Sequence, residues 1–142
     1  MRDARLVSKR FEIKDSFKIE VAKANGVYAD ALKRAYELEP LEIINIIKES
    51  GLRGKGGGGA SAGDKWELMP LESDKPSFLA VNCDESEPGT FKDRQIISKD
   101  PHLLIEGILI TCRAIKAKHA YIYIRGEYKQ FQDILQNAID EA

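Results

Sequence analysis

The fold is decided by the apolar run FLAVN at residues 78–82, which turn-forming residues bound on both sides. A short run of this kind is typical of a buried strand in an α/β sheet. A helix with a wide apolar face is expected at residues 102–117, and a second strand, rich in β-branched and aromatic residues, at 120–124. A final amphipathic helix follows Gly126. This order predicts a Rossmann-like βαβα unit of an α/β fold, with parallel strands joined by a right-handed crossover.

Upstream of that unit the sequence predicts an N-terminal helical arm. Residues 1–26 alternate weakly between apolar and polar, which favours an extended arm or short strands before a turn at Asn25-Gly26. Apolar residues recur at helical spacing from 28 to 38, where Pro40 ends the pattern, and a second apolar helix face runs from 41 to 50.

We therefore divide the chain into two parts. Residues 1–50 hold the N-terminal arm and its helices, and residues 51–142 hold a glycine-rich loop and the α/β unit. Two strands are too few for a complete doubly wound sheet, so the second part is expected to be half of a larger domain.

Composition excludes several classes of function. The 142 residues are 43% hydrophobic and 32% charged with a formal net charge of −1, which does not provide a basic surface for nucleic acid. No run approaches the roughly 18 apolar residues of a transmembrane helix, and residues 1–4 lack the apolar core of a signal peptide. Cys83 and Cys112 have no C-x-x-C companion and are expected to be reduced thiols. We expect a cytoplasmic protein that meets a membrane only through partners.

The most unusual stretch is GLRGKGGGGASAG at residues 51–63, which holds seven of the eleven glycines. Glycine lets backbone amides converge on an anion and lets a planar ligand approach the main chain. The stretch contains G-x-G-x-x-G, but no strand precedes it, as a dinucleotide fingerprint requires. Two interpretations stay open here: a flexible linker or a loop that holds a cofactor. Arg53 and Lys65-Trp66 favour the second, because a tether gains nothing from a cation and an indole.

An acidic loop follows the first predicted strand. Asn82, Asp84, Glu85 and Glu87 crowd the carboxyl end of that strand, where open α/β sheets place their ligands. Amide and carboxylate groups can bond the polar edge of a flavin or a nicotinamide carboxamide. The alternative is a solvated turn whose charges pair with residues 92–94. A metal site is not expected, because no histidine accompanies the cluster.

Three sequence blocks carry a resemblance to a known family. They are NCDESEPGTFKDR at residues 82–94, PHLLIEG at 101–107 and YIYIRGEY at 121–128. Together with the glycine-rich stretch they resemble the flavoprotein subunit of respiratory complex I and its relatives in NAD-linked hydrogenases and formate dehydrogenases. The resemblance covers roughly residues 40–142, and blocks of this length and order are specific.

The resemblance implies an FMN site, an NADH cleft and transfer of hydride from NADH to FMN. Glu87 is implied to face the nicotinamide as the catalytic residue. The residues implied to bind the cofactor are Gly54, Gly56, Gly57, Gly58, Gly59, Gly63, Lys65, Asn82, Asp84 and Glu85.

The resemblance also implies partners. Electrons would pass to iron–sulfur clusters, with a [4Fe–4S] cluster held by cysteines beyond Ala142. The neighbours would be other subunits of a complex I-like peripheral arm, notably a [2Fe–2S] thioredoxin-like subunit. Since further flavin contacts are also expected beyond Ala142, the chain alone is expected to be inactive.

Two departures from the family pattern concern the NADH cleft. Ala60-Ser61-Ala62 stands where the family has F-P-T, and Leu68 replaces a second aromatic residue. The sequence therefore leaves an alternative open, an electron-relay or interaction module whose NADH site has degenerated and whose donor is a reduced protein. The intact Glu87 favours the NADH-dependent function. A third possibility is an inactive fragment that folds only in part.

Overall fold

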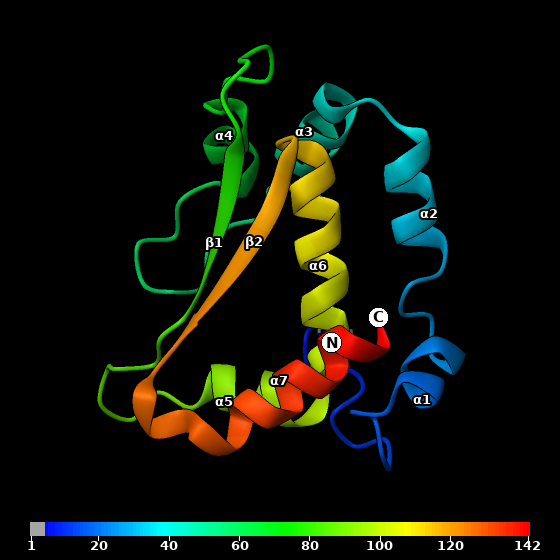
Figure 1. Ribbon diagram of the computed structural model, residues 1–142, viewed down its shortest axis with the longest axis vertical. Helices are drawn as coiled ribbons and strands as arrows, with labels where there is room; N and C mark the ends of the chain where they lie inside the picture. Colours follow the sequence, from blue (N-terminus) through cyan, green and yellow to red (C-terminus); the bar gives the residue numbers. More distant parts are fainter. Residues whose placement is uncertain (1–4) are drawn as a thin grey trace. The chain divides into compact units, whose positions relative to one another are not determined.

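The computed structural model describes residues 5–142. Residues 1–4, for which we predicted no apolar signal-peptide core, lie outside this range. The order of elements is seen in Figure 1. The chain forms two compact units, one from residues up to Ala29, Ala80–Ile108 and Ile122–Ala142, the other from Asp30–Leu79 and Leu109–Tyr121. We call them the first and the second unit. Helix α6 (Pro101–Ala114) and strands β1 (Ser77–Cys83) and β2 (Ala117–Ile124) contribute residues to both.

Strands β1 and β2 pair in parallel and form the sheet of the described residues. Helices α5 (Lys92–Lys99) and α6 lie between them in the sequence, and α7 (Lys129–Glu141) follows β2 after the short 3-10 helix η1 (Gly126–Tyr128). This order and the parallel pairing confirm the predicted α/β class and its βαβα unit.

The first unit packs around Cys83, Ile97 and Leu135, which come from β1, α5 and α7. Partly buried apolar residues of the sheet and helices surround this core, among them Val81, Leu104, Ile122, Ile124, Phe131 and Ile134. Helix α1 (Ile19–Ala24) belongs to the same unit and ends at the predicted turn, where Gly26 adopts a φ of +87°.

The second unit contains α2 (Asp30–Glu37), α3 (Pro40–Glu49) and α4 (Ala62–Glu67). Its core is formed by Ala35, Ile43, Ile44, Ala114 and Ile115. Helix α3 begins at Pro40, one residue before the predicted apolar face; the missing N–H of Pro40 costs nothing at the first helical position, and Glu39 and Glu42 form a capping box there.

Two predictions were wrong. Residues 5–18 form turns rather than strands, and α1 follows them. Strand β1 is not buried on both faces: its side chains alternate, and Phe78 is 52% exposed. Tyr121 and Tyr123 of β2 are also exposed, at 63% and 66%. A sheet with both faces covered needs helices on both sides, and within the described residues one face of this sheet is open to solvent.

Helices α4 and α5 were not predicted. Both are short, six and eight residues, and each begins in a segment whose sequence is dominated by loop signals. None of the helices formed by residues 5–142 is long and apolar enough to cross a membrane.

Candidate functional site

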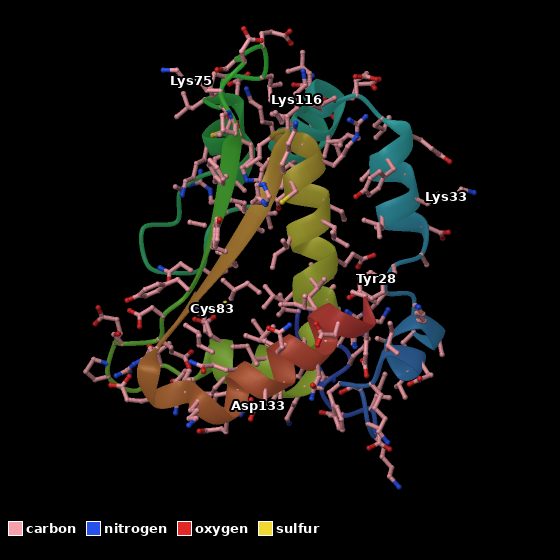
Figure 2. The ribbon with its side chains drawn as sticks, viewed as in Figure 1. Tyr28, Lys33, Lys75, Cys83, Lys116 and Asp133 are labelled. Carbon is pink, nitrogen blue, oxygen red and sulfur yellow. The ribbon has the colours of Figure 1, made fainter. Side chains whose placement is uncertain are left out.

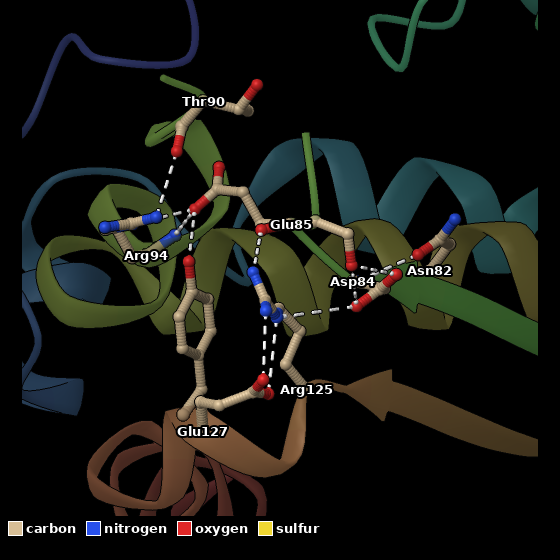
Figure 3. Close-up of polar contacts among 9 residues, drawn as sticks. Asn82, Asp84, Glu85, Thr90, Arg94, Arg125 and Glu127 are labelled. Atoms are coloured by element: carbon tan, nitrogen blue, oxygen red, sulfur yellow. Dashed lines mark hydrogen bonds and ion pairs between the residues drawn. The ribbon is translucent and has the colours of Figure 1, made fainter. Parts of the chain in front are cut away.

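The acidic loop begins where β1 ends at Cys83, which Figure 2 labels. The four polar residues predicted at this strand end differ in how deeply they are buried. Glu85 is buried and only 2% exposed, Asp84 is half-buried, and Asn82 and Glu87 are exposed. Figure 3 draws hydrogen bonds of Asn82, Asp84 and Glu85.

The Glu85 carboxylate is enclosed by donors from two helices. Its Oε1 accepts the Asp93 N–H at 2.7 Å, and its Oε2 accepts Arg94 Nε at 2.9 Å and the Tyr128 hydroxyl at 3.0 Å. Since the residue preceding α5, Phe91, provides no side-chain cap, Glu85 acts as the cap of α5 from six residues upstream.

These contacts decide the ionisation of Glu85. Burial disfavours the charged form, but the hydrogen bonds from Asp93 N–H, Arg94 and Tyr128 outweigh it and lower the pKa of Glu85 below its usual value. Burial and the hydrogen bond to Glu85 in turn raise the pKa of Tyr128, so the phenol keeps its proton and remains a donor.

Arg125 reaches the same loop from the end of β2 (Figure 3). Its Nη1 donates to the main-chain carbonyl of Glu85 at 2.7 Å, and its Nε lies 4.0 Å from Asp84 Oδ1. Glu127 holds the other side of the guanidinium, with Nη2 to Oε1 at 3.0 Å. One cation therefore bonds the main chain of the loop and lies at ion-pair distance from its aspartate.

Asn82 and Asp84 form bonds within the loop. Asn82 Oδ1 accepts the Asp84 N–H at 2.8 Å, and the Ser86 hydroxyl lies 2.9 and 2.8 Å from the two Asp84 carboxylate oxygens. Among residues 5–142, the Asn82 side-chain NH₂ and the Glu87 carboxylate have no hydrogen-bond or ion-pair partner. The strand end therefore consists of a fixed frame and two polar groups that are left for solvent or a ligand.

The glycine-rich stretch closes on itself. Arg53 and Ser61 form an antiparallel bridge, Gly54 N–H donates to Ala60 O at 2.9 Å, and Ala62 N–H donates to Leu52 O at 2.9 Å. The Arg53 guanidinium donates to Gly59 O at 2.9 Å inside this closed loop. Its two flanks lead into α3 and α4, which pack on each other within the second unit. A closed loop between packed helices does not span two bodies, so the linker interpretation is not supported.

Gly63 differs from the other predicted glycines because it is buried in α4. A Cβ there would lie 2.6 Å from Lys48 N and 2.8 Å from Lys48 Cα of α3, so only glycine permits this approach. Lys48 Nζ bonds Glu67 at 2.7 Å and thereby also joins the two helices. Gly63 therefore has a packing role that the sequence did not indicate.

The glycines at the tip of the loop are not required by packing. Cβ atoms at Gly56, Gly57, Gly58 and Gly59 would meet no atom within 4 Å. Gly57 and Gly59 need positive φ, +118° and +60°, whereas no such value occurs at Gly56 and Gly58. An exposed backbone free of Cβ atoms is what a planar ligand would need in order to lie against it.

The structure thus divides the predicted site residues between the two units. Asn82, Asp84, Glu85 and Glu87 belong to the first unit; the glycines and Lys65, an exposed residue of α4, belong to the second.

Sequence reasoning assigned no role to Arg125 or Tyr128, although they lie in the YIYIRGEY block. The signal was available, because the carboxyl ends of adjacent parallel strands lie at the same edge of a sheet.

Comparisons with known proteins agree on one family. A model of the Nuo51 FMN-binding domain matches residues 47–142, more than half of the chain. The NADH-quinone oxidoreductase F 2 subunit of Rhizobium meliloti (strain 1021) is 45% identical over 131 residues, which are 92% of this chain and 31% of that protein. The NADH-quinone oxidoreductase F subunit of Aquifex aeolicus (strain VF5) is 54% identical over 112 residues, 79% of this chain and 26% of that protein.

A solved structure is similar as well. An NAD⁺-reducing [NiFe]-hydrogenase in the H₂-reduced state matches with a TM-score of 0.70 and 33% identity, covering 83% of this chain and 21% of that one. The chain spans about a quarter to a third of the length of the curated relatives named above. The match over residues 47–142 shows that the chain belongs to the Nuo51 FMN-binding domain family.

Proposed function

We propose that this chain is the N-terminal part of the electron-input flavoprotein subunit of an NADH-quinone oxidoreductase. The names of its relatives support this assignment, since they are F subunits of that enzyme and an NAD⁺-reducing hydrogenase. Residues 1–50 would form the arm and its helices, and residues 51–142 the first half of the FMN- and NADH-binding domain.

The observation that carries the proposal is the contrast within the strand end. Glu85 and Asp84 are engaged by Arg94, Arg125, Tyr128 and Ser86, whereas the Asn82 NH₂ and the Glu87 carboxylate are not engaged by any of residues 5–142. A loop whose main chain is held by these contacts and whose two remaining polar groups are free is suited to ligand recognition, because less backbone entropy remains to be lost on binding.

In this proposal the two free polar groups bind different ligands. The Asn82 NH₂ donates to a flavin carbonyl oxygen, and the Glu87 carboxylate accepts a hydrogen bond from the nicotinamide carboxamide. Glu85 contributes a contact through its main chain only, because its carboxylate is already occupied. Bound FMN would supply the redox chemistry, which is acceptance of a hydride from NADH and release of single electrons.

In this proposal the glycine loop is a cofactor-binding segment of the second unit. Its open backbone at Gly56–Gly59 admits a planar or phosphate-bearing ligand, Gly54 closes the base of the loop, and Lys65 adds a cation. Gly63 supports the loop by allowing α4 to pack on α3.

The partners and location follow from the same assignment. Electrons would leave to iron–sulfur clusters, through a complex I-like peripheral arm that includes a [2Fe–2S] thioredoxin-like subunit. The protein would be cytoplasmic and attached to the membrane only by the complex, and residues 1–142 by themselves would be inactive. No observation favours the protein-fed relay. Leu68, which stands where the family has an aromatic residue, is 83% exposed.

Two substitutions in the full-length protein test the site. Asn82→Asp keeps the oxygen that accepts the Asp84 N–H but replaces the free donor by a charged acceptor, so FMN affinity should fall at least about tenfold. Glu87→Gln should retain FMN and weaken NADH binding. Equilibrium dialysis of FMN and anaerobic titration with NADH provide the two measurements.

Glu127→Gln is the matched control, because it removes an exposed carboxylate of the same cluster that does not touch the acidic loop. If Asn82→Asp retained FMN as well as the control did, the assignment of Asn82 would be wrong. Loss of FMN in Glu87→Gln would contradict the separate role given to Glu87.

A further inference from the structure

The acidic loop is fixed from outside by two residues that follow β2, Arg125 and Tyr128. Arg125 Nη1 donates to the carbonyl oxygen of Glu85 at 2.7 Å, and the Tyr128 hydroxyl donates to the carboxylate of the same residue at 3.0 Å. Glu85 is therefore bound at its main chain by one residue and at its side chain by the other. Because both its main chain and its side chain are bound, the orientation of Glu85 is fixed as well as its position.

The carbonyl that Arg125 binds belongs to the peptide between Glu85 and Ser86. The orientation of that peptide determines the direction in which the chain continues to Glu87, the next residue but one. Arg125 touches neither the Glu87 carboxylate nor the Asn82 NH₂. Its influence on these two groups passes through the backbone of the loop.

Arg125 is itself held in position. Glu127 accepts both Nη2 at 3.0 Å and Nε at 3.4 Å, and the guanidinium lies 5.7 Å from the centroid of the Tyr128 ring. The guanidinium of Arg94 lies 5.2 Å from the same centroid. A planar guanidinium with several fixed donors can bond the Glu85 carbonyl and Glu127 at once, which an ammonium group cannot do with the same geometry.

We propose that Arg125 is a positioning residue of this site, which sets the Glu85–Ser86 peptide and thereby places the Glu87 carboxylate for its ligand. The inference rests on the function proposed above and adds a residue from the second strand to it. Arg125 contacts no ligand in this assignment. Loss of Arg125 should therefore weaken NADH binding through Glu87 more than it weakens FMN binding.

The test uses the full-length protein with FMN bound and compares three variants. Arg125→Gln removes the charge and the fork of donors, and Arg125→Lys keeps the charge alone. Asp133→Asn is the control, because it removes an exposed carboxylate of α7 and leaves Arg125 and Glu127 unchanged. Amide hydrogen exchange of residues 84–90 without NADH reports the loop directly. The Michaelis constant for NADH and the turnover number with an artificial acceptor report the position of Glu87.

We expect Arg125→Gln to accelerate exchange in residues 84–90 and to raise the Michaelis constant for NADH about tenfold, the effect of one charge-assisted hydrogen bond. The turnover number and bound FMN should change by less than about twofold. Arg125→Lys should fall between wild type and Arg125→Gln in both measurements, and Asp133→Asn should remain close to wild type.

Unchanged exchange in Arg125→Gln would overturn the inference, and so would faster exchange with an unchanged Michaelis constant. If Arg125→Gln instead lost its FMN, Arg125 would be part of the flavin site and not a positioning residue for Glu87. A wild-type protein that bound neither FMN nor NADH would overturn the proposed function itself, a result that differs from all of these because it appears before any substitution is made.

Discussion

The acidic loop and the glycine loop are held in opposite ways. The acidic loop is held by side chains: a buried carboxylate takes donors from Asp93, Arg94 and Tyr128, and Arg125 binds its main chain. The glycine loop is held by its main chain at the base, through the bridge between Arg53 and Ser61, while no Cβ at its tip would touch another atom. The first loop resists change through its contacts, whereas the tip of the second has few contacts and resists change only where Gly57 and Gly59 need positive φ.

This difference separates residues that shape the fold from residues available to a ligand. In each loop one predicted site residue proves to be structural, Glu85 in the first and Gly63 in the second. Substitution of these two should affect folding, whereas substitution of their neighbours should affect binding. The predictions below test that separation, beginning with the largest expected effect.

Glu85→Ala should cause the largest loss of stability. It leaves the buried Tyr128 hydroxyl and the Asp93 N–H without their acceptor and removes the cap of α5. We expect the free energy of unfolding to fall by about 3 kcal/mol, at the lower end for a broken buried pair because Arg94 is partly exposed and can be hydrated. Urea-induced unfolding measures this free energy.

Glu87→Ala is the control for this experiment, since the Glu87 carboxylate has no partner among residues 5–142. Its effect on stability should stay within about 0.5 kcal/mol. Equal losses in the two variants would show that the acidic loop is not divided into a frame and free groups.

Gly63→Ala should have the next largest effect. The added Cβ would collide with the main chain of Lys48, which cannot move away without separating α3 from α4. We expect a loss of about 2 kcal/mol, typical of overpacking, together with the loss of FMN binding that depends on the loop. Thermal unfolding followed by circular dichroism measures the change, and a variant as stable as wild type would refute the packing role.

Acid should weaken the frame of the acidic loop in a defined direction. The folded pKa of Glu85 is lowered, so its stabilising contribution is complete above its unfolded value near 4.5 and is lost as the pH falls toward the folded pKa. Burial raises the pKa of Asp100 and Glu106 in the same unit, and their contribution has the opposite sign.

The contribution of Glu85 alone is therefore measured as the difference in the free energy of unfolding between wild type and a Glu85 variant at each pH. We expect Glu85→Gln to be less stable than wild type at pH 7 by about 1 kcal/mol, since it loses the charge on an otherwise similar side chain. That difference should shrink as the pH falls below 4.5. A gap that stays constant down to pH 3 would mean that folding does not lower the pKa of Glu85.

The sequence predicted the parts of the fold that depend on local pattern. Both strands, α3, α6 and the turn at Gly26 followed from hydrophobic period and turn chemistry. Helix α5 was missed because its cap is Glu85, six residues before Phe91, and a cap at that distance has no local signature. The exposed face of β1 was missed because an apolar run does not tell whether one or both sheet faces are covered.

The candidate site was predicted to a similar extent. The acidic loop and the glycine loop were both identified by composition and by family resemblance. The roles within them depend on contacts between residues far apart in the chain, Glu85 with Tyr128 and Gly63 with Lys48, which a single sequence does not reveal.

The smallest change in stability is expected at the tip of the glycine loop. A Cβ at Gly58 would meet no atom within 4 Å, and Gly58 does not adopt a positive φ, so Gly58→Ala should alter the free energy of unfolding by less than about 0.5 kcal/mol. If FMN lies against this backbone in the full-length protein, the added methyl group would hold the ligand away from it. FMN affinity should then fall about tenfold or more while the fold is unchanged. Equilibrium dialysis and thermal unfolding of the same preparation measure the two quantities together.

Gly26→Ala serves as the control, because Gly26 lies in a turn far along the chain from the loop and its φ of +87° should make the substitution destabilising without affecting FMN. If Gly58→Ala bound FMN as tightly as wild type did, the ligand would not contact the tip, and the open glycine backbone would need another explanation.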